Sequence, residues 1–96
     1  MRREDVIRLI RERDVEIRAF GVRHLSLFGS VARDTAGPAS DVDILVDFES
    51  APSFEEYMGL RAFLEDLLGR NIDLADRAAL RLQLHPRIEE DEIAVA

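Results

Sequence analysis

The sequence predicts a protein of the α/β (α+β) class, in which a small sheet is covered by helices. Two observations predict this class. Segments with apolar residues at helical spacing alternate along the chain with short apolar runs of the kind that form strands. The chain has 96 residues, of which 47% are hydrophobic, a length that suits one modest core and no second domain. We therefore expect a single domain over residues 1–96, with the order helix, strand, helix, strand, helix, strand, helix.

The first helix is expected over residues 4–20, where apolar residues recur at helical spacing between Arg and Glu residues. Gly21 is its expected end. A short strand follows over residues 23–28, and Ser30 then suits the N-cap of one helical turn over residues 30–35. The apolar positions of the first helix are Val6, Leu9, Ile10, Ile17 and Phe20.

The clearest strand signal lies over residues 41–48, after a segment at residues 36–40 whose composition is typical of a loop. Ile44, Leu45 and Val46 form a continuous apolar run in this strand. Because a strand that is apolar on both faces is buried on both, we expect this strand to be central in the sheet.

A second long helix is expected over residues 54–68. Pro52 and Ser53 mark its start, and Gly69 marks its end. The residues expected on its apolar, core-facing side are Phe54, Tyr57, Met58, Leu60, Phe63, Leu64, Leu67 and Leu68.

The last part of the chain carries weaker signals. Residues 70–75 suit a third strand, and Asp76 is a good N-cap for a short helix over residues 76–82. Residues 83–96 contain Pro86 and a cluster of acidic residues, so we expect loose helix or coil there.

The composition excludes several classes of protein. The net charge is -7, all 13 basic residues are Arg, and only 6% of residues are aromatic, which argues against direct binding to nucleic acid or to an anionic membrane. The absence of Cys excludes disulfides and thiolate metal sites. No apolar run approaches the ~20 residues of a membrane span, and the first residues do not form a signal peptide. We expect a cytoplasmic protein that binds cations or a basic partner.

Two acidic residues stand at the start of the predicted central strand. Because side chains alternate along a strand, Asp41 and Asp43 are expected on one face, with Cβ atoms about 6–7 Å apart. Neighbouring carboxylates resist joint ionisation, so such a pair suits either a solvated surface or a bound divalent cation. Magnesium prefers oxygen ligands, often together with substrate phosphates. The buried strand favours a site, since ligand sites in sheets lie at strand ends.

A Gly-Ser pair ends the first predicted strand. Gly29 lets the backbone come close to a ligand, and a helix that begins at Ser30 would offer free N–H groups to a phosphate. The alternative is an ordinary turn from strand to helix with a Ser cap. Arg33, one turn further on, suits either a phosphate contact or a solvated surface position.

A third acidic residue lies in the last predicted strand. Asp73 stands between Ile72 and Leu74, so it faces away from both. It is either an ordinary outward-facing residue or, if its strand pairs beside residues 41–47, a third carboxylate near the other two. Spacing in the sequence leaves both alternatives open.

Taken together, three segments resemble the nucleotidyltransferase superfamily. They are Leu-Phe-Gly-Ser-Val-Ala-Arg at residues 27–33, Ser-Asp-Val-Asp-Ile-Leu-Val at residues 40–46, and Leu-Leu-Gly-Arg-Asn-Ile-Asp-Leu at residues 67–74. The resemblance is strongest to the minimal nucleotidyltransferase (MNT) antitoxins of HEPN/MNT toxin–antitoxin modules, and it covers roughly residues 4–93.

The resemblance implies a nucleotidyltransferase fold, with a small mixed sheet of three to four strands flanked by helices. It also implies two Mg²⁺ ions and the transfer of AMP from ATP to a tyrosine of a HEPN ribonuclease toxin, which is thereby neutralised. The residues that it assigns to catalysis and metal binding are Asp41, Asp43 and Asp73. Those that it assigns to nucleotide binding are Gly29, Ser30, Arg33 and Ser40.

Two classes of function follow from these expectations. The first is an enzyme that modifies its partner. The second is an MNT-fold antitoxin that blocks its partner by non-covalent binding. The complete set of glycine, serine and aspartates favours the enzyme, because an inert binding protein has no need of all of them. A chain of this length has no room for a large acceptor-binding domain, so a partner protein is expected to present the acceptor. Either a complex with that partner or a homodimer is compatible with the sequence.

Overall fold

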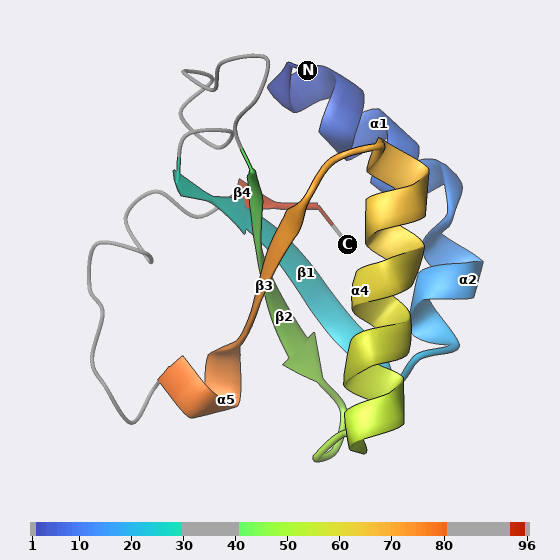
Figure 1. Cartoon of the computed structure of the whole chain (residues 1–96), viewed down its shortest axis with the longest axis vertical. Coiled ribbons are helices and arrows are strands. Elements are labelled where there is room, and N and C mark those ends of the chain that lie inside the picture. Colours follow the sequence, from blue (N-terminus) through green and yellow to red (C-terminus); the bar gives the residue numbers. More distant parts are fainter. Residues whose placement is uncertain (1, 30–40, 81–92, 96) are drawn as a thin grey trace.

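A computed structural model of the chain describes residues 2–29, 41–80 and 93–95. The elements, in chain order, are α1 (Arg3–Glu12), α2 (Asp14–Arg18), β1 (Val22–Phe28), β2 (Val42–Phe48), α4 (Phe54–Leu68), β3 (Ile72–Asp76), α5 (Arg77–Leu80) and β4 (Ile93–Ala94). Four strands form one sheet in the order β3-β2-β1-β4, and α1, α2 and α4 lie on one side of it (Figure 1). In the described part of the chain, no helix is both long and apolar enough to cross a membrane.

β2 is the centre of the sheet, as its apolar run predicts. It pairs with β1 in the antiparallel sense and with β3 in the parallel sense, so the sheet is mixed. Its alternate residues Val42, Ile44 and Val46 are buried in one core cluster with side chains from α1, α2 and α4. These helices therefore cover one face of the sheet, and the residues that alternate with this set belong to the other face.

The helix expected over residues 4–20 is interrupted. The backbone at Arg13 (φ −111°, ψ 24°) leaves the helical region, and α2 begins at the next residue. The buried residues Val6, Ile10 and Ile17 keep helical spacing straight through this point. Because the apolar period does not change there, the pattern gives no signal for the break.

α4 covers residues 54–68, as predicted. Ser53 Oγ accepts a hydrogen bond from the Glu56 N–H at 3.1 Å, and Glu56 Oε1 accepts one from the Ser53 N–H at 3.0 Å. This capping box fixes the start of the helix. Gly69, at φ +64°, ends it in the left-handed region.

The predicted apolar face of α4 is partly wrong. Leu60, Leu64 and Leu68 are buried, but Phe54 is 78% exposed and Met58 is 37% exposed. At about 100° per residue, Met58 lies roughly 120° around the helix from the centre of the leucine stripe. Phe54 lies one turn before Met58 on the same side, so both side chains face away from the core.

The end of the chain contains a strand that the sequence does not predict. β4 pairs in the antiparallel sense with β1, and the Val95 N–H donates to the Leu25 carbonyl at 2.9 Å. The expectation of loose helix or coil is therefore wrong at residues 93–94. Two residues carry no local strand pattern, and only the contact with β1 makes them a strand. The helical turn at residues 30–35 and the loop at residues 36–40 lie outside the described residues.

Candidate active site

The sheet places two of the predicted site aspartates side by side. Asp43 of β2 pairs with Asp73 of the parallel strand β3, and Phe28 of β1 pairs with Asp43 from the other side. Residues paired across neighbouring strands present their side chains on the same face, and the strands lie about 4.8 Å apart. The carboxylates of Asp43 and Asp73 therefore share the face of the sheet opposite the helix-covered core.

Gly29 lies directly against Asp43. Its backbone is at φ +69°, which disfavours any side chain. A Cβ at this position would collide with the Asp43 carboxylate and would stand 3.2 Å from its Cγ. Glycine is thus required for two separate reasons, and the end of β1 lies against the second aspartate of the Asp-x-Asp segment.

Asp41 is an exposed residue immediately before β2, which begins one residue later than predicted. The next residue, Val42, donates its N–H to the Asn71 carbonyl at 3.0 Å. This bond ties the backbone beside Asp41 to the start of β3, two residues before Asp73. The other predicted nucleotide-binding residues, Ser30, Arg33 and Ser40, lie outside the described residues.

The face that carries the aspartates changes from exposed to buried along the strands. Asp73 is exposed and Asp43 is half-buried. One pair further into the sheet on the same face, Leu45 and Ser26 are opposite each other and each is only 2% exposed. The carboxylates thus stand at the solvated end of a strand pair whose middle is buried.

The chemistry of these donors fits magnesium. In residues 2–29, 41–80 and 93–95, no three His, Asp or Glu side chains gather closely enough to hold a metal ion by themselves. Magnesium does not need such a cage, because it commonly takes one or two carboxylates and completes its shell with water and substrate phosphates. Asp43 and Asp73 supply two carboxylates in register, and Asp41 supplies a third just before β2. The set suits a cation that arrives together with a nucleotide.

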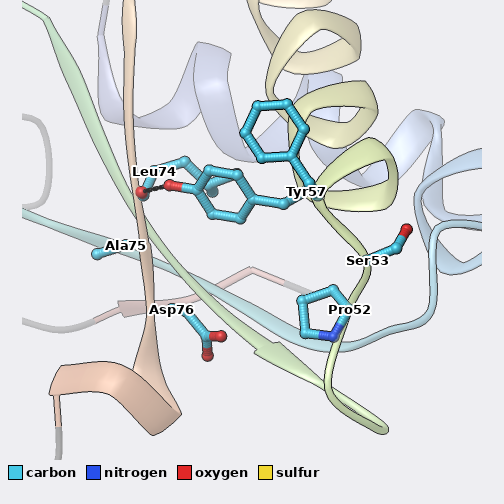
Figure 2. A pocket seen from close by; sticks show the side chains of 7 residues that line it. Pro52, Ser53, Tyr57, Leu74, Ala75 and Asp76 are labelled. Carbon is cyan, nitrogen blue, oxygen red and sulfur yellow. Dashed lines mark hydrogen bonds between the residues drawn. The ribbon is translucent and has the colours of Figure 1, made fainter.

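Tyr57 makes a contact beside the site that the sequence pattern did not predict. Its hydroxyl donates a hydrogen bond to the Leu74 carbonyl, so α4 holds β3 at the residue after Asp73 (Figure 2). Burial raises the pKa of the Tyr57 hydroxyl, the Arg61 charge lowers it, and Asp73 and Asp76 raise it. A single Tyr among the leucines of an amphipathic helix was the one available signal for this contact.

A comparison with family models identifies the class of protein to which this sheet and its aspartates belong. The model described as a nucleotidyltransferase domain matches residues 6–95, nearly the whole chain. The chain therefore belongs to the nucleotidyltransferase domain family, and the predicted mixed sheet flanked by helices is confirmed.

Individual relatives narrow this class. The chain is 48% identical over 62 residues to the protein adenylyltransferase MntA of Thermococcus cleftensis, a match that covers 65% of this chain and 63% of that protein. A solved structure of a candidate minimal nucleotidyltransferase matches with a TM-score of 0.79 and 33% identity, over 97% of this chain and 95% of that one.

A third similarity concerns the fold alone. A chain in the complex of tri-AMPylated Shewanella oneidensis HEPN toxin with MNT antitoxin matches with a TM-score of 0.66 and 18% identity. The match covers 94% of this chain and 71% of that one. The predicted resemblance to the MNT group is thus confirmed by sequence and by structure.

Proposed function

We propose that this chain transfers AMP from ATP to a tyrosine of a HEPN ribonuclease toxin and thereby neutralises the toxin. The observation that carries the proposal is the register of Asp43 and Asp73 beside Gly29, in a chain of the nucleotidyltransferase family. The names of the relatives support the class of reaction, a protein adenylyltransferase, and the class of partner, a HEPN toxin.

The proposed ligands of two Mg²⁺ ions are Asp41, Asp43 and Asp73. When bound, magnesium would neutralise charge on the triphosphate and lower the pKa of the incoming hydroxyl. Gly29, with no side chain, would let the phosphates approach the end of β1. Ser30, Arg33 and Ser40 are proposed as further nucleotide contacts. The remaining contribution of the chain is positioning, which is most of what phosphoryl transfer requires.

Asp73 is the proposed acceptor of the proton. It is exposed on β3, an edge strand of the sheet, and so it can meet a hydroxyl presented from outside. The tyrosine oxygen would form a bond to the α-phosphorus of ATP as the bond from that phosphorus to the bridging oxygen breaks. Pyrophosphate leaves, and the hydroxyl proton passes to Asp73. Asp43, half-buried between β1 and β3, would keep the reacting groups in place.

The charge of the chain is consistent with a protein partner. A net charge of -7 favours association with a basic protein and disfavours direct contact with nucleic acid. Together with the composition, this supports a cytoplasmic protein that acts on its partner within a complex.

The experiment is to mix the chain with its cognate HEPN protein below one copy per toxin, with ATP and Mg²⁺, and then to separate the two. An enzyme would leave the toxin heavier by one or more AMP units, and its ribonuclease activity would stay lost after separation. Unchanged toxin mass, with inhibition that follows stoichiometry and ignores ATP, would instead establish the non-covalent antitoxin.

A further inference from the structure

A cleft lies between the start of α4 and the end of β3, at the edge of the helix-covered core. Its volume is about 520 Å³. In Figure 2, Pro52 and Ser53 stand on one side, Leu74, Ala75 and Asp76 of β3 stand on the other, and the Tyr57 ring lies between them. The residues that line the cleft are Pro52, Ser53, Phe54, Tyr57, Leu74, Ala75 and Asp76.

The cleft is lined by an aromatic side chain that is not part of the hydrophobic core. Phe54, at 78% exposure, packs little of its ring against the protein, and Met58 one turn later is 37% exposed. In the described part of the chain, the remaining large exposed hydrophobic residue is Val15, which belongs to α2. Exposed apolar groups that cluster beside a cleft mark interaction sites, and aromatic residues and Met are enriched in them.

The lining of this cleft carries one negative charge, that of Asp76. Glu55, next to Phe54, is exposed, and Arg61, whose charge acts on Tyr57, lies further along α4. An apolar surface with an acidic edge is complementary to an apolar side chain that stands next to Arg or Lys. It does not suit a phosphate-bearing ligand, which these carboxylates would repel.

The cleft also lies close to the proposed acceptor side of the active site. Asp76 is three residues after Asp73 on the same strand, a distance of about 10 Å at ~3.3 Å per residue. Asp73 and Asp76 point to opposite faces, but β3 is an edge strand, so a partner that wraps this edge reaches both.

We propose that this cleft is the docking site for the acceptor protein. An apolar side chain of the partner seats against Phe54 and Pro52, and a basic residue beside it meets Asp76. The proposal rests on the proposed function for the identity of the partner, and it adds the surface and the chemistry by which that partner is held.

The first test compares Phe54→Ala with Val15→Ala, which removes an equally exposed apolar side chain from α2. Kd for the cognate HEPN protein is measured for the native chain and for both variants, with far-UV circular dichroism to confirm that each is folded. Because a central aromatic anchor carries much of the energy of an interface, Phe54→Ala should weaken binding about tenfold or more. Val15→Ala should leave Kd unchanged.

The second test concerns charge. Asp76→Asn keeps a side chain that can cap α5, where Asp76 Oδ1 now accepts from the Ala78 N–H at 3.0 Å, and removes the negative charge. Its matched control is Asp66→Asn, an exposed acid near the other end of α4. Asp76→Asn should slow association at low salt and lose that difference at high salt, whereas Asp66→Asn should change neither.

AMP transfer to the HEPN protein is measured in parallel, so that the two proposals can fail separately. Under the docking proposal, Phe54→Ala raises KM for the HEPN protein and leaves kcat at saturating partner unchanged. If the native chain binds but transfers no AMP, the proposed function fails while the loss of binding in Phe54→Ala still supports docking. If Phe54→Ala binds as tightly as native, or if the native chain does not bind at all, the docking proposal is overturned.

Discussion

Gly29 is restricted both by its backbone conformation and by its contact with a proposed site residue. It has a positive φ and it lies against the carboxylate of Asp43. Gly69 shares the positive φ, at +64°, but a Cβ there would meet nothing within 4 Å. A comparison of substitutions at Gly29 and Gly69 can therefore distinguish the cost of backbone strain from the effect of contact with Asp43.

Replacing each glycine with Ala tests this difference. Both Gly29→Ala and Gly69→Ala should lower the free energy of unfolding by about 1–2 kcal/mol, the usual cost of a left-handed residue with a side chain. Gly29→Ala should in addition displace Asp43 and reduce AMP transfer more than tenfold. Transfer assays and thermal unfolding of both variants check this. Equal transfer by the two variants would show that the close approach at Gly29 has no role in the reaction.

α4 is the element that joins the core to the site. Its leucine stripe packs on the sheet, and Tyr57 bonds to β3 next to Asp73. Both ends of α4 were predictable because each carries a local signal, the capping box at Ser53 and the left-handed Gly69. The break at Arg13 was not predictable, because the apolar spacing continues through it.

In the site, too, some features follow from the local sequence and others from contacts between distant segments of the chain. That Asp43 and Asp73 face away from the core follows from alternation along each strand. Their register follows from the order of the strands in the sheet, which spacing in the sequence does not determine. The exposure of Phe54 depends in the same way on how α4 packs in the folded chain, so the sequence predicted its helix but not its exposure.

Tyr57 gives a prediction at this scale that depends on pH. Its folded-state pKa is raised above 10.0, so the protonated hydroxyl stabilises the fold below its unfolded pKa, and this contribution is lost as pH rises through the higher folded value. The chain has one Tyr, no Lys and no Cys, so few other groups titrate in that range.

Near neutral pH, the free energy of unfolding of Tyr57→Phe should be about 0.5–1.5 kcal/mol lower than that of the native chain, because the hydrogen bond to Leu74 is lost. Between about pH 9 and 11, where tyrosine titrates, the native chain should lose stability and the variant should not. Urea unfolding across this range is the measurement. A variant that loses stability with pH as steeply as native would assign the effect to another group.

At the scale of the whole molecule, a small mixed sheet divides its two faces between stability and chemistry. One face carries the core beneath α1, α2 and α4, and the other presents two carboxylates in register at its solvated end. Under the proposed function, a partner protein presents the acceptor hydroxyl at this end of the sheet. That residues 1–96 form one domain stays a prediction.

The most direct test of the central claim is the transfer of labelled AMP from ATP to the cognate HEPN protein, with Mg²⁺, by native chain and by the double variant Asp41→Asn, Asp43→Asn. If the proposed function is right, the native chain labels the HEPN protein and the variant does not. Because removal of like charges relieves repulsion between them, the metal-free variant should be at least as stable as native. Transfer by the double variant at the native rate would contradict the assignment of these aspartates to the active site.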